Sequence, residues 1–363
     1  MMTGVADSRF CSVCARQAGL DPGGSGGGIF DTVLAVEMPL PWPATLYGDT
    51  QRMPPEILAL MEHIRSEYQR TRELRILTQM IAPDADYSVP GYRRVIGWQR
   101  PDGPFARFQQ SEYLVPDDQI GSLAYALALA PERLGDFAAF RQPADDVRDL
   151  LVCTHGTVDA ACSKFGYPAY RQLRRIAAES GETLRVWRTT HFGGHVFAPT
   201  LMDMPHGSYW AYIGVEEAQL LAHESGDPAR LYAHYRGWAG LPAPFLQVLE
   251  RELFVRHGWS WRDYAKTGQI LSQDQRSPSP ADEPGEPAWV EVRIDYASPD
   301  GRDSGAYRAR VELSQRIEII HTSGQDALYA YPQYSVAGLE HIADDPQDQL
   351  HVGRSICATG NML

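Results

Sequence analysis

The 363-residue sequence lacks the features that direct a chain into or across a membrane. Its first residues, Met1 to Asp7, have neither a basic start nor an apolar core, which argues against a secretory signal. The longest run of small apolar residues, Ala124 to Ala130, is far too short to span a bilayer. We therefore expect no association with a membrane.

The sequence is also poor in cysteine and has an excess of acidic charge. Five cysteines, an odd number in a long chain without a signal, fit a reducing compartment better than a disulfide scaffold, so we expect the protein in the cytoplasm. The formal net charge is -13 and the arginines are scattered among acidic residues, so no nucleic-acid surface is expected. An acidic surface suits a basic redox partner protein, although solubility alone explains such a balance at least as often.

Motifs for nucleotide binding and for glycoside hydrolysis are missing as well. No Rossmann or P-loop glycine pattern sits between an expected strand and an expected helix, so no bound nucleotide is predicted. No pair of carboxylates stands out as the acid and base of a glycosidase. An electron carrier or redox protein is therefore expected in preference to a glycoside hydrolase.

The sequence does contain two cysteines and two histidines in distinctive positions: Cys153, Cys162, His191 and His195. Thiolates and imidazoles are common ligands of transition metals. Zinc modules usually pair cysteines two to four residues apart, whereas Cys153 and Cys162 have eight residues between them. A 2Fe-2S cluster is wider than one ion, and in Rieske centres two histidines replace two cysteines on one iron. The set therefore fits such a cluster, with zinc as the alternative.

The residues around these side chains resemble the sucrase/ferredoxin-like family. The resemblance rests on Cys153-Thr154-His155-Gly156 with Cys162, and on the segment 186–200, which contains His191-Phe192-Gly193-Gly194-His195. It covers roughly residues 10 to 260. Members of this family are thioredoxin-like ferredoxins, in which a Cys, Cys, His-x-x-x-His set holds a 2Fe-2S cluster. The resemblance implies that Cys153, Cys162, His191 and His195 bind that cluster, and that the Ala198-Pro199 bond is cis.

Polar residues next to these ligands are candidates for tuning the cluster. Hydroxyl groups can donate hydrogen bonds to sulfur, and cations can offset the charge of the reduced cluster; the candidates are Thr154, Ser163, Thr189, Thr190, Lys164 and Arg188. Ordinary turn and strand hydrogen bonds are the alternative for the hydroxyls, and a solvated surface is the alternative for the cations. His155 is either an alternative ligand or a hydrogen-bonding residue of the turn.

The order of expected elements repeats along the chain. Strand, helix, strand, hairpin and helix are expected in residues 29–145, and the same order returns in residues 146–265. Together with the family resemblance, this order predicts an α/β fold of two thioredoxin-like halves, each βαβββα. The first half has no candidate ligands, and the second is the ferredoxin half.

The flanking segments have other compositions. Residues 1–28 end in a glycine-rich run and predict a flexible segment, in which Cys11 and Cys14 are interpreted as structural or incidental. Residues 266–287 predict a linker. Residues 288–363 alternate apolar and polar side chains and predict a small antiparallel β-rich domain, with a helix around 336–342 and a lone thiol at Cys357. This domain is expected to mediate protein contacts.

The expected function is one-electron transfer, as the electron-donating unit of a reductase or of a biosynthetic redox system. Two histidine ligands favour a potential of roughly -150 to +300 mV over the plant-type value of about -400 mV. Two other functions remain open. One is a thiol-disulfide oxidoreductase that uses Cys153 and Cys162; the other is a zinc-stabilised binding module.

Overall fold

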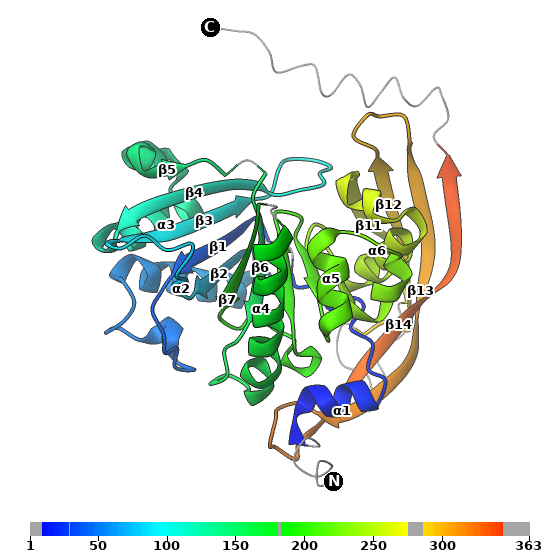
Figure 1. Cartoon of the computed structure of the whole chain (residues 1–363). Coiled ribbons are helices and arrows are strands. Elements are labelled where there is room, and N and C mark those ends of the chain that lie inside the picture. The colour runs from blue at the N-terminus through cyan, green and yellow to red at the C-terminus, as the bar shows by residue number, and fades with distance from the viewer. Residues whose placement is uncertain (1–8, 29, 145, 181–182, 275–285, 344–363) are drawn as a thin grey trace, which may run out of the picture.

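The computed structural model describes residues 9–28, 30–144, 146–180, 183–274 and 286–343. Its largest feature is a mixed sheet of ten strands (Figure 1) in the order β10-β9-β8-β6-β7-β2-β1-β3-β4-β5. The strands are β1 (Thr32–Glu37), β2 (Ile76–Ile81), β3 (Tyr92–Gln99), β4 (Gln109–Pro116), β5 (Arg141–Gln142), β6 (Arg148–Cys153), β7 (Leu184–Thr189), β8 (Leu201–Met204), β9 (Ser208–Trp210) and β10 (Tyr235–Trp238).

The first half of this sheet is built around β1. Strand β2 runs parallel to β1 on one side, β3 runs antiparallel on the other, and β4 pairs with β3. Helices α2 (Pro55–Thr71) and α3 (Ile120–Leu129) pack against each other and against these strands. Pro55 opens α2, where its missing N–H costs nothing, and Ile57 and Leu60 are fully buried on the side facing the sheet.

The second half repeats this arrangement around β6. Strand β7 is parallel to β6, β8 is antiparallel to it, and β9 pairs with β8. Helices α4 (Ala160–Ser180) and α5 (Val215–His223) pack together here. The side chain of Asp159 accepts a hydrogen bond from the N–H of Ala161 at 2.8 Å, which satisfies one of the unpaired donors at the start of α4. The order expected from the sequence is therefore observed in both halves.

The two halves meet between β2 and β7, where Ile81 pairs with Thr189. Hydroxyl groups reinforce this junction, because Thr189 Oγ1 and Thr190 Oγ1 both donate to Gln79 Oε1, at 3.2 and 3.0 Å. Arg185 adds a buried ionic link, with its Nη2 2.7 Å from Glu112 and its Nε 2.8 Å from Asp149. The halves thus form one continuous sheet.

A separate antiparallel sheet follows, in the order β11-β12-β13-β14. Its strands are β11 (Ala265–Gln273), β12 (Trp289–Ala297), β13 (Ser304–Ile320) and β14 (Leu328–Ala343). Alternate residues of β12, among them Val290, Val292 and Ile294, are fully buried and face α6 (Pro244–His257) and the main core. The mixed α/β class and the small C-terminal antiparallel sheet are therefore confirmed.

The flanking segments differ from their expected conformations. Residues Cys11–Gln17 form a helix, α1, rather than a flexible segment, because Cys11 and Ala15 are fully buried. The glycines that follow are packed tightly: a β-carbon on Gly26 would lie 2.7 Å from the carbonyl oxygen of Gly237. Glycine is needed here because two backbone segments lie too close together for a side chain, and not because the segment is flexible.

At the C-terminal side, two expectations are corrected. The first part of the expected linker is strand β11, and the expected helix around 336–342 belongs to β14, which pairs with β13 along its length. Cross-strand pairing decides this conformation, and sequence spacing alone does not reveal it. The remainder of the linker from 275 to 285, and Cys357, lie outside the described residues.

Candidate metal centre

Three of the four expected ligands come together at the carboxyl ends of strands β6 and β7, near the middle of the sheet. Cys153 ends β6, Cys162 lies in the first turn of α4, and His191 follows β7. Because β6 and β7 are parallel neighbours, the segments that leave them lie side by side. The Nδ1 atom of His191 lies 3.7 Å from Cys153 Sγ and 3.6 Å from Cys162 Sγ.

These separations suit ligands of one metal ion. Metal–sulfur bonds of about 2.3 Å and metal–nitrogen bonds of about 2.0–2.1 Å place sulfur and nitrogen about 3.6 Å apart on a tetrahedral centre. The three ligand atoms lie within 4.8 Å of one another, so they form a candidate metal group. We call Cys153, Cys162 and His191 the inner group.

Both thiols of the inner group are almost fully buried, with 1% of each residue exposed. Burial acts to raise the pKa of Cys153, but the hydrogen bond with Cys162 and the nearby His191 ring outweigh it and hold that pKa well below its usual value. The pKa of Cys162 is raised, first by its hydrogen bond with Cys153 and then by burial. One thiolate is therefore favoured without a metal, and a cation would stabilise the second.

His195 lies in a different group. Its Nδ1 is 3.4 Å from Cys11 Sγ and 3.6 Å from Asp159 Oδ2, and Cys11 Sγ is 3.7 Å from Asp159 Oδ1. These three residues also meet the distance requirement for a metal group, and we call them the outer group. Burial lowers the pKa of His195 to about 4, so the imidazole is neutral at physiological pH and its nitrogen is available to a metal.

A tight turn connects the two groups. The rings of His191 and His195 are 5.4 Å apart between centroids. Gly193 and Gly194 lie between the two histidines. Their φ angles are 92° and 80°, values that residues with a side chain rarely adopt. Arg236 holds this turn, with Nη1 donating to Gly193 O at 3.2 Å and Nη2 donating to Ser25 O at 2.6 Å.

The hydroxyl groups proposed as sulfur donors have other partners. Those of Thr189 and Thr190 are directed to Gln79, as described above, and Ser163 Oγ donates to Ala160 O at 3.3 Å. Thr154 Oγ1 accepts from Arg188 Nε at 3.4 Å. These hydroxyls anchor the loops around the thiols.

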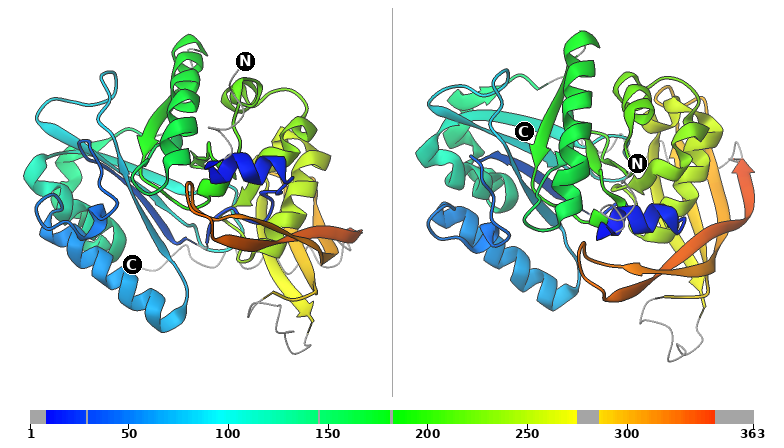
Figure 2. Two further views of the ribbon diagram at one scale, coloured as in Figure 1. Left: turned by 90° about the horizontal axis from the view of Figure 1, so that it is seen from below. Right: turned by 60° about the horizontal axis from the view of Figure 1, so that its bottom comes forward.

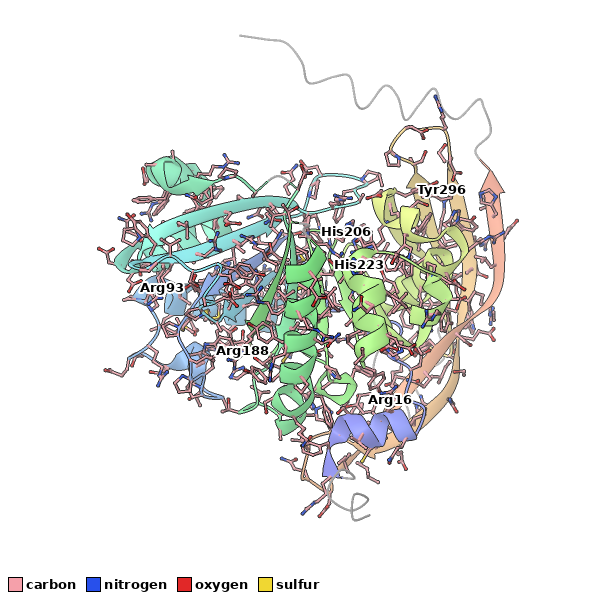
Figure 3. The ribbon with its side chains drawn as sticks, in the orientation of Figure 1. Arg16, Arg93, Arg188, His206, His223 and Tyr296 are labelled. Atoms are coloured by element: carbon pink, nitrogen blue, oxygen red, sulfur yellow. The ribbon has the colours of Figure 1, made fainter. Side chains whose placement is uncertain are left out.

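The remaining neighbours fall into two kinds. His155 is buried, and its Nδ1 accepts a hydrogen bond from the backbone N–H of His191 at 3.3 Å, so it positions His191. Arg188 lies beside α4 (Figure 3), with its guanidinium 5.1 Å from the centre of the Tyr167 ring. Lys164 is exposed on α4.

Sequence reasoning did not associate three residues with the site: Cys11, Asp159 and Ser323. Cys11 is 184 positions from His195, and no pattern links them. Ser323, in the turn between β13 and β14, donates its N–H to Asp159 Oδ2 at 2.9 Å and its hydroxyl to Asp159 Oδ1 at 2.7 Å. Only the Cys-x-x-Cys spacing at Cys11 offered a signal, and it pointed to no partner.

The fold and site define a mixed α/β protein in which two adjacent groups of cysteine, histidine and aspartate side chains can hold metal. Comparison with known families finds a match to the Sucrase/ferredoxin-like family over residues 28–237. The chain belongs to this family. The Ala198-Pro199 peptide bond is cis, as the resemblance implied.

Two other comparisons, with curated proteins and with solved structures, gave no match. Among the described residues, none of the helices combines the length and apolar character needed to cross a membrane. The family match leaves out both α1 and the C-terminal sheet, although Cys11 and Ser323 from those parts reach the site.

Proposed function

We propose that this protein is a one-electron carrier with a 2Fe-2S cluster held by Cys153, Cys162, His191 and His195. The observation that supports this most directly is the position of His195. It lies outside the inner group but adjacent to it, with its ring centroid 5.4 Å from that of His191. A single ion needs its ligands around one point, whereas a binuclear cluster needs ligands around two neighbouring points.

The chemical character of the four side chains agrees with this assignment. Cysteine thiolates and neutral imidazoles are the ligands of Rieske-type clusters. The two thiols are buried, whereas both histidines are partly exposed, and the side chain of His195 keeps 14% of its surface accessible. The histidine side therefore offers the shorter path for an electron to reach a partner protein.

The fold is consistent with two thioredoxin-like halves. The sheet order β2-β1-β3-β4 in the first half matches β7-β6-β8-β9 in the second. In the second half, Pro199 directly precedes Thr200, whose carbonyl accepts a hydrogen bond from the N–H of Cys153 at 3.1 Å. A proline beside the functional loop is the arrangement that the family resemblance implies.

When bound, a 2Fe-2S core supplies a one-electron couple, with a potential in the Rieske range of roughly -150 to +300 mV when two ligands are histidines. The protein would contribute a site that is closed to water on one side and a fixed position for the histidines. Buried thiols exclude water from one side, and the Arg236 contacts fix the turn that carries both histidines. The acidic chain, with a formal charge of -13, suits a basic redox partner.

A zinc-stabilised protein is the second candidate, favoured by the inner group alone. Its three ligand atoms have separations that fit a single tetrahedral ion. Zinc in the inner group would not involve His195, which belongs to the separate outer group.

Metal and sulfide analysis of the full-length protein separates these proposals. For the cluster, we expect about two irons and two acid-labile sulfides per chain, a red-brown colour, and a rhombic EPR signal of the reduced protein. His191→Cys and His195→Cys should each shift that signal and lower the potential, because thiolate donates more charge than imidazole. Cys14→Ser, on α1, belongs to neither metal group and is the matched control.

The outcomes are distinct. About one zinc per chain without sulfide would support the zinc protein and refute the cluster. An unchanged spectrum and potential in both histidine variants would show that neither histidine binds iron.

A further inference from the structure

Cys11 is a buried thiol in direct contact with a proposed cluster ligand. Its Sγ lies 3.4 Å from His195 Nδ1, and the residue has no exposed surface. A tetrahedral metal bound to both atoms would hold them about 3.6 Å apart. The contact therefore places the sulfur of Cys11 within reach of a metal that His195 binds.

Two segments outside the family match hold Cys11 there. Helix α1 and the turn between β13 and β14 lie side by side at one end of the molecule (Figures 1 and 2), and Gly324 N donates to Arg9 O at 2.9 Å. The N–H of Cys11 donates to Ser323 Oγ at 3.1 Å. Phe10 stacks edge to face on Phe165 of α4, with ring centroids 5.3 Å apart. The position of Cys11 is thus fixed from three directions.

The third member of the outer group has a structural role instead. Both oxygens of Asp159 accept hydrogen bonds: Oδ1 from Ala161 N and Ser323 Oγ, and Oδ2 from Ser323 N. Asp159 therefore caps α4 and anchors the Ser323 turn. By contrast, the sulfur of Cys11 contacts His195 Nδ1 at 3.4 Å, Ser323 Oγ at 3.4 Å and Asp159 Oδ1 at 3.7 Å, and hydrogen bonds of a thiol are weak. Between Asp159 and Cys11, the Cys11 sulfur therefore has weaker hydrogen bonds to give up on binding a metal.

We propose that Cys11 is an alternative iron ligand that takes the place of His195, so that the cluster is held either by two cysteines and two histidines or by three cysteines and one histidine. This inference rests on the proposed function. In the exchange, the iron–nitrogen bond to His195 breaks and an iron–sulfur bond to Cys11 forms. The Cys11 thiol would lose its proton to solvent, which reaches the partly exposed side chain of His195, and the released imidazole would stay neutral. No electron is transferred.

The test compares full-length variants after reconstitution with iron and sulfide. His195→Ala should keep at least half of the wild-type iron and sulfide, and its EPR signal should shift toward that of a thiolate-rich cluster. The double variant His195→Ala/Cys11→Ala should keep less than one tenth. His195→Ala/Cys14→Ala is the matched control, since Cys14 lies one turn further along the same helix, and it should match His195→Ala.

A further variant removes the ambiguity of misfolding. His195→Cys/Cys11→Ala returns a thiolate to position 195 and should regain the cluster, which an unfolded protein would not do. Equal cluster content in His195→Ala and in the double variant would overturn the role of Cys11, whether both keep the cluster or both lose it. Wild-type protein that binds no iron and sulfide would instead overturn the proposed function itself.

Discussion

A β-carbon placed on Gly166 would lie 2.0 Å from the carbonyl oxygen of Cys153. Gly166 belongs to α4, one turn beyond Cys162, and Cys153 ends β6. The missing side chain is therefore what lets α4 approach β6 closely enough to bring the two thiols together. Backbone atoms cannot rotate away as a side chain can, so any larger residue must separate the helix from the strand.

We expect Gly166→Ala to separate Cys162 from Cys153 and to weaken the site. Forcing a methyl group into a packed interior typically costs about 1–3 kcal/mol of unfolding free energy. Denaturant titration and metal content of the purified protein measure the two effects. Gly135→Ala is the control, because a β-carbon there would meet nothing within 4 Å. A Gly166→Ala protein with wild-type stability and metal content would show that the close approach is unimportant.

The second prediction concerns Arg236, which is buried against the turn between the two histidines. Burial lowers its pKa to about 10, so it remains charged at neutral pH. Arg236→Met removes the hydrogen bonds to Gly193 and Ser25, and leaves their carbonyl oxygens without these donors. We expect a loss of about 2–3 kcal/mol in unfolding free energy and a several-fold faster release of metal to a chelator.

Arg230→Met provides the comparison for Arg236. Its ion pair with Glu216 is exposed, with 54% and 76% of the side chains accessible, and such pairs contribute at most about 1 kcal/mol. Metal release should be unchanged in this variant. If Arg236→Met also releases metal at the wild-type rate, the turn does not depend on this arginine.

The third prediction is a dependence of stability on pH through Asp203. This carboxylate is fully buried and accepts from Arg148, at 2.8 Å, and from Arg262, at 2.6 Å. Burial acts to raise its pKa, but the two guanidinium groups outweigh that effect and hold the pKa well below its usual value. The stabilisation is thus present above the unfolded pKa of about 3.9 and is lost as pH falls through the lower folded pKa.

Asp203→Asn should cost about 3–5 kcal/mol at pH 7, because two buried cations lose their buried carboxylate and keep only the partly exposed Glu224. The difference from the wild type should shrink as the pH is lowered below about 4, as measured by urea unfolding at several pH values. Asp263→Asn, whose pair with Arg107 is exposed, should cost less than about 1 kcal/mol. A constant difference between wild type and Asp203→Asn at all pH values would contradict the assignment.

Local sequence patterns were sufficient to predict the strand, helix, strand, hairpin and helix that the two halves share, and strand β12 of the C-terminal sheet, but not β5 or β10. The alternation of Val290, Val292 and Ile294 predicted a half-buried strand, and the helical spacing after Pro55 predicted α2. The N-terminal glycines and the segment around Val336 were interpreted wrongly. In both places the conformation is decided by contacts with distant residues, such as Gly237 for Gly26 and β13 for β14.

The site was predictable to the extent that its ligands follow neighbouring strands. Cys153 ends β6 and His191 follows β7, and these strands lie next to each other, so the proximity of the two residues follows from the order of elements. The contact of His195 with Cys11 depends instead on the packing of α1, from the start of the chain, against the second half of the sheet. The family match over residues 28–237 excludes Cys11 and so carries no information about such a contact.

The covering of His195 by α1 and the β13–β14 turn has a practical consequence for preparing the protein. A fragment trimmed to residues 28–237 would retain the four proposed ligands but lack Cys11 and Ser323. The edge of the His195 imidazole would then face solvent, oxygen and chelators, so the trimmed protein is the wrong material for testing how durably the intact chain holds the proposed cofactor.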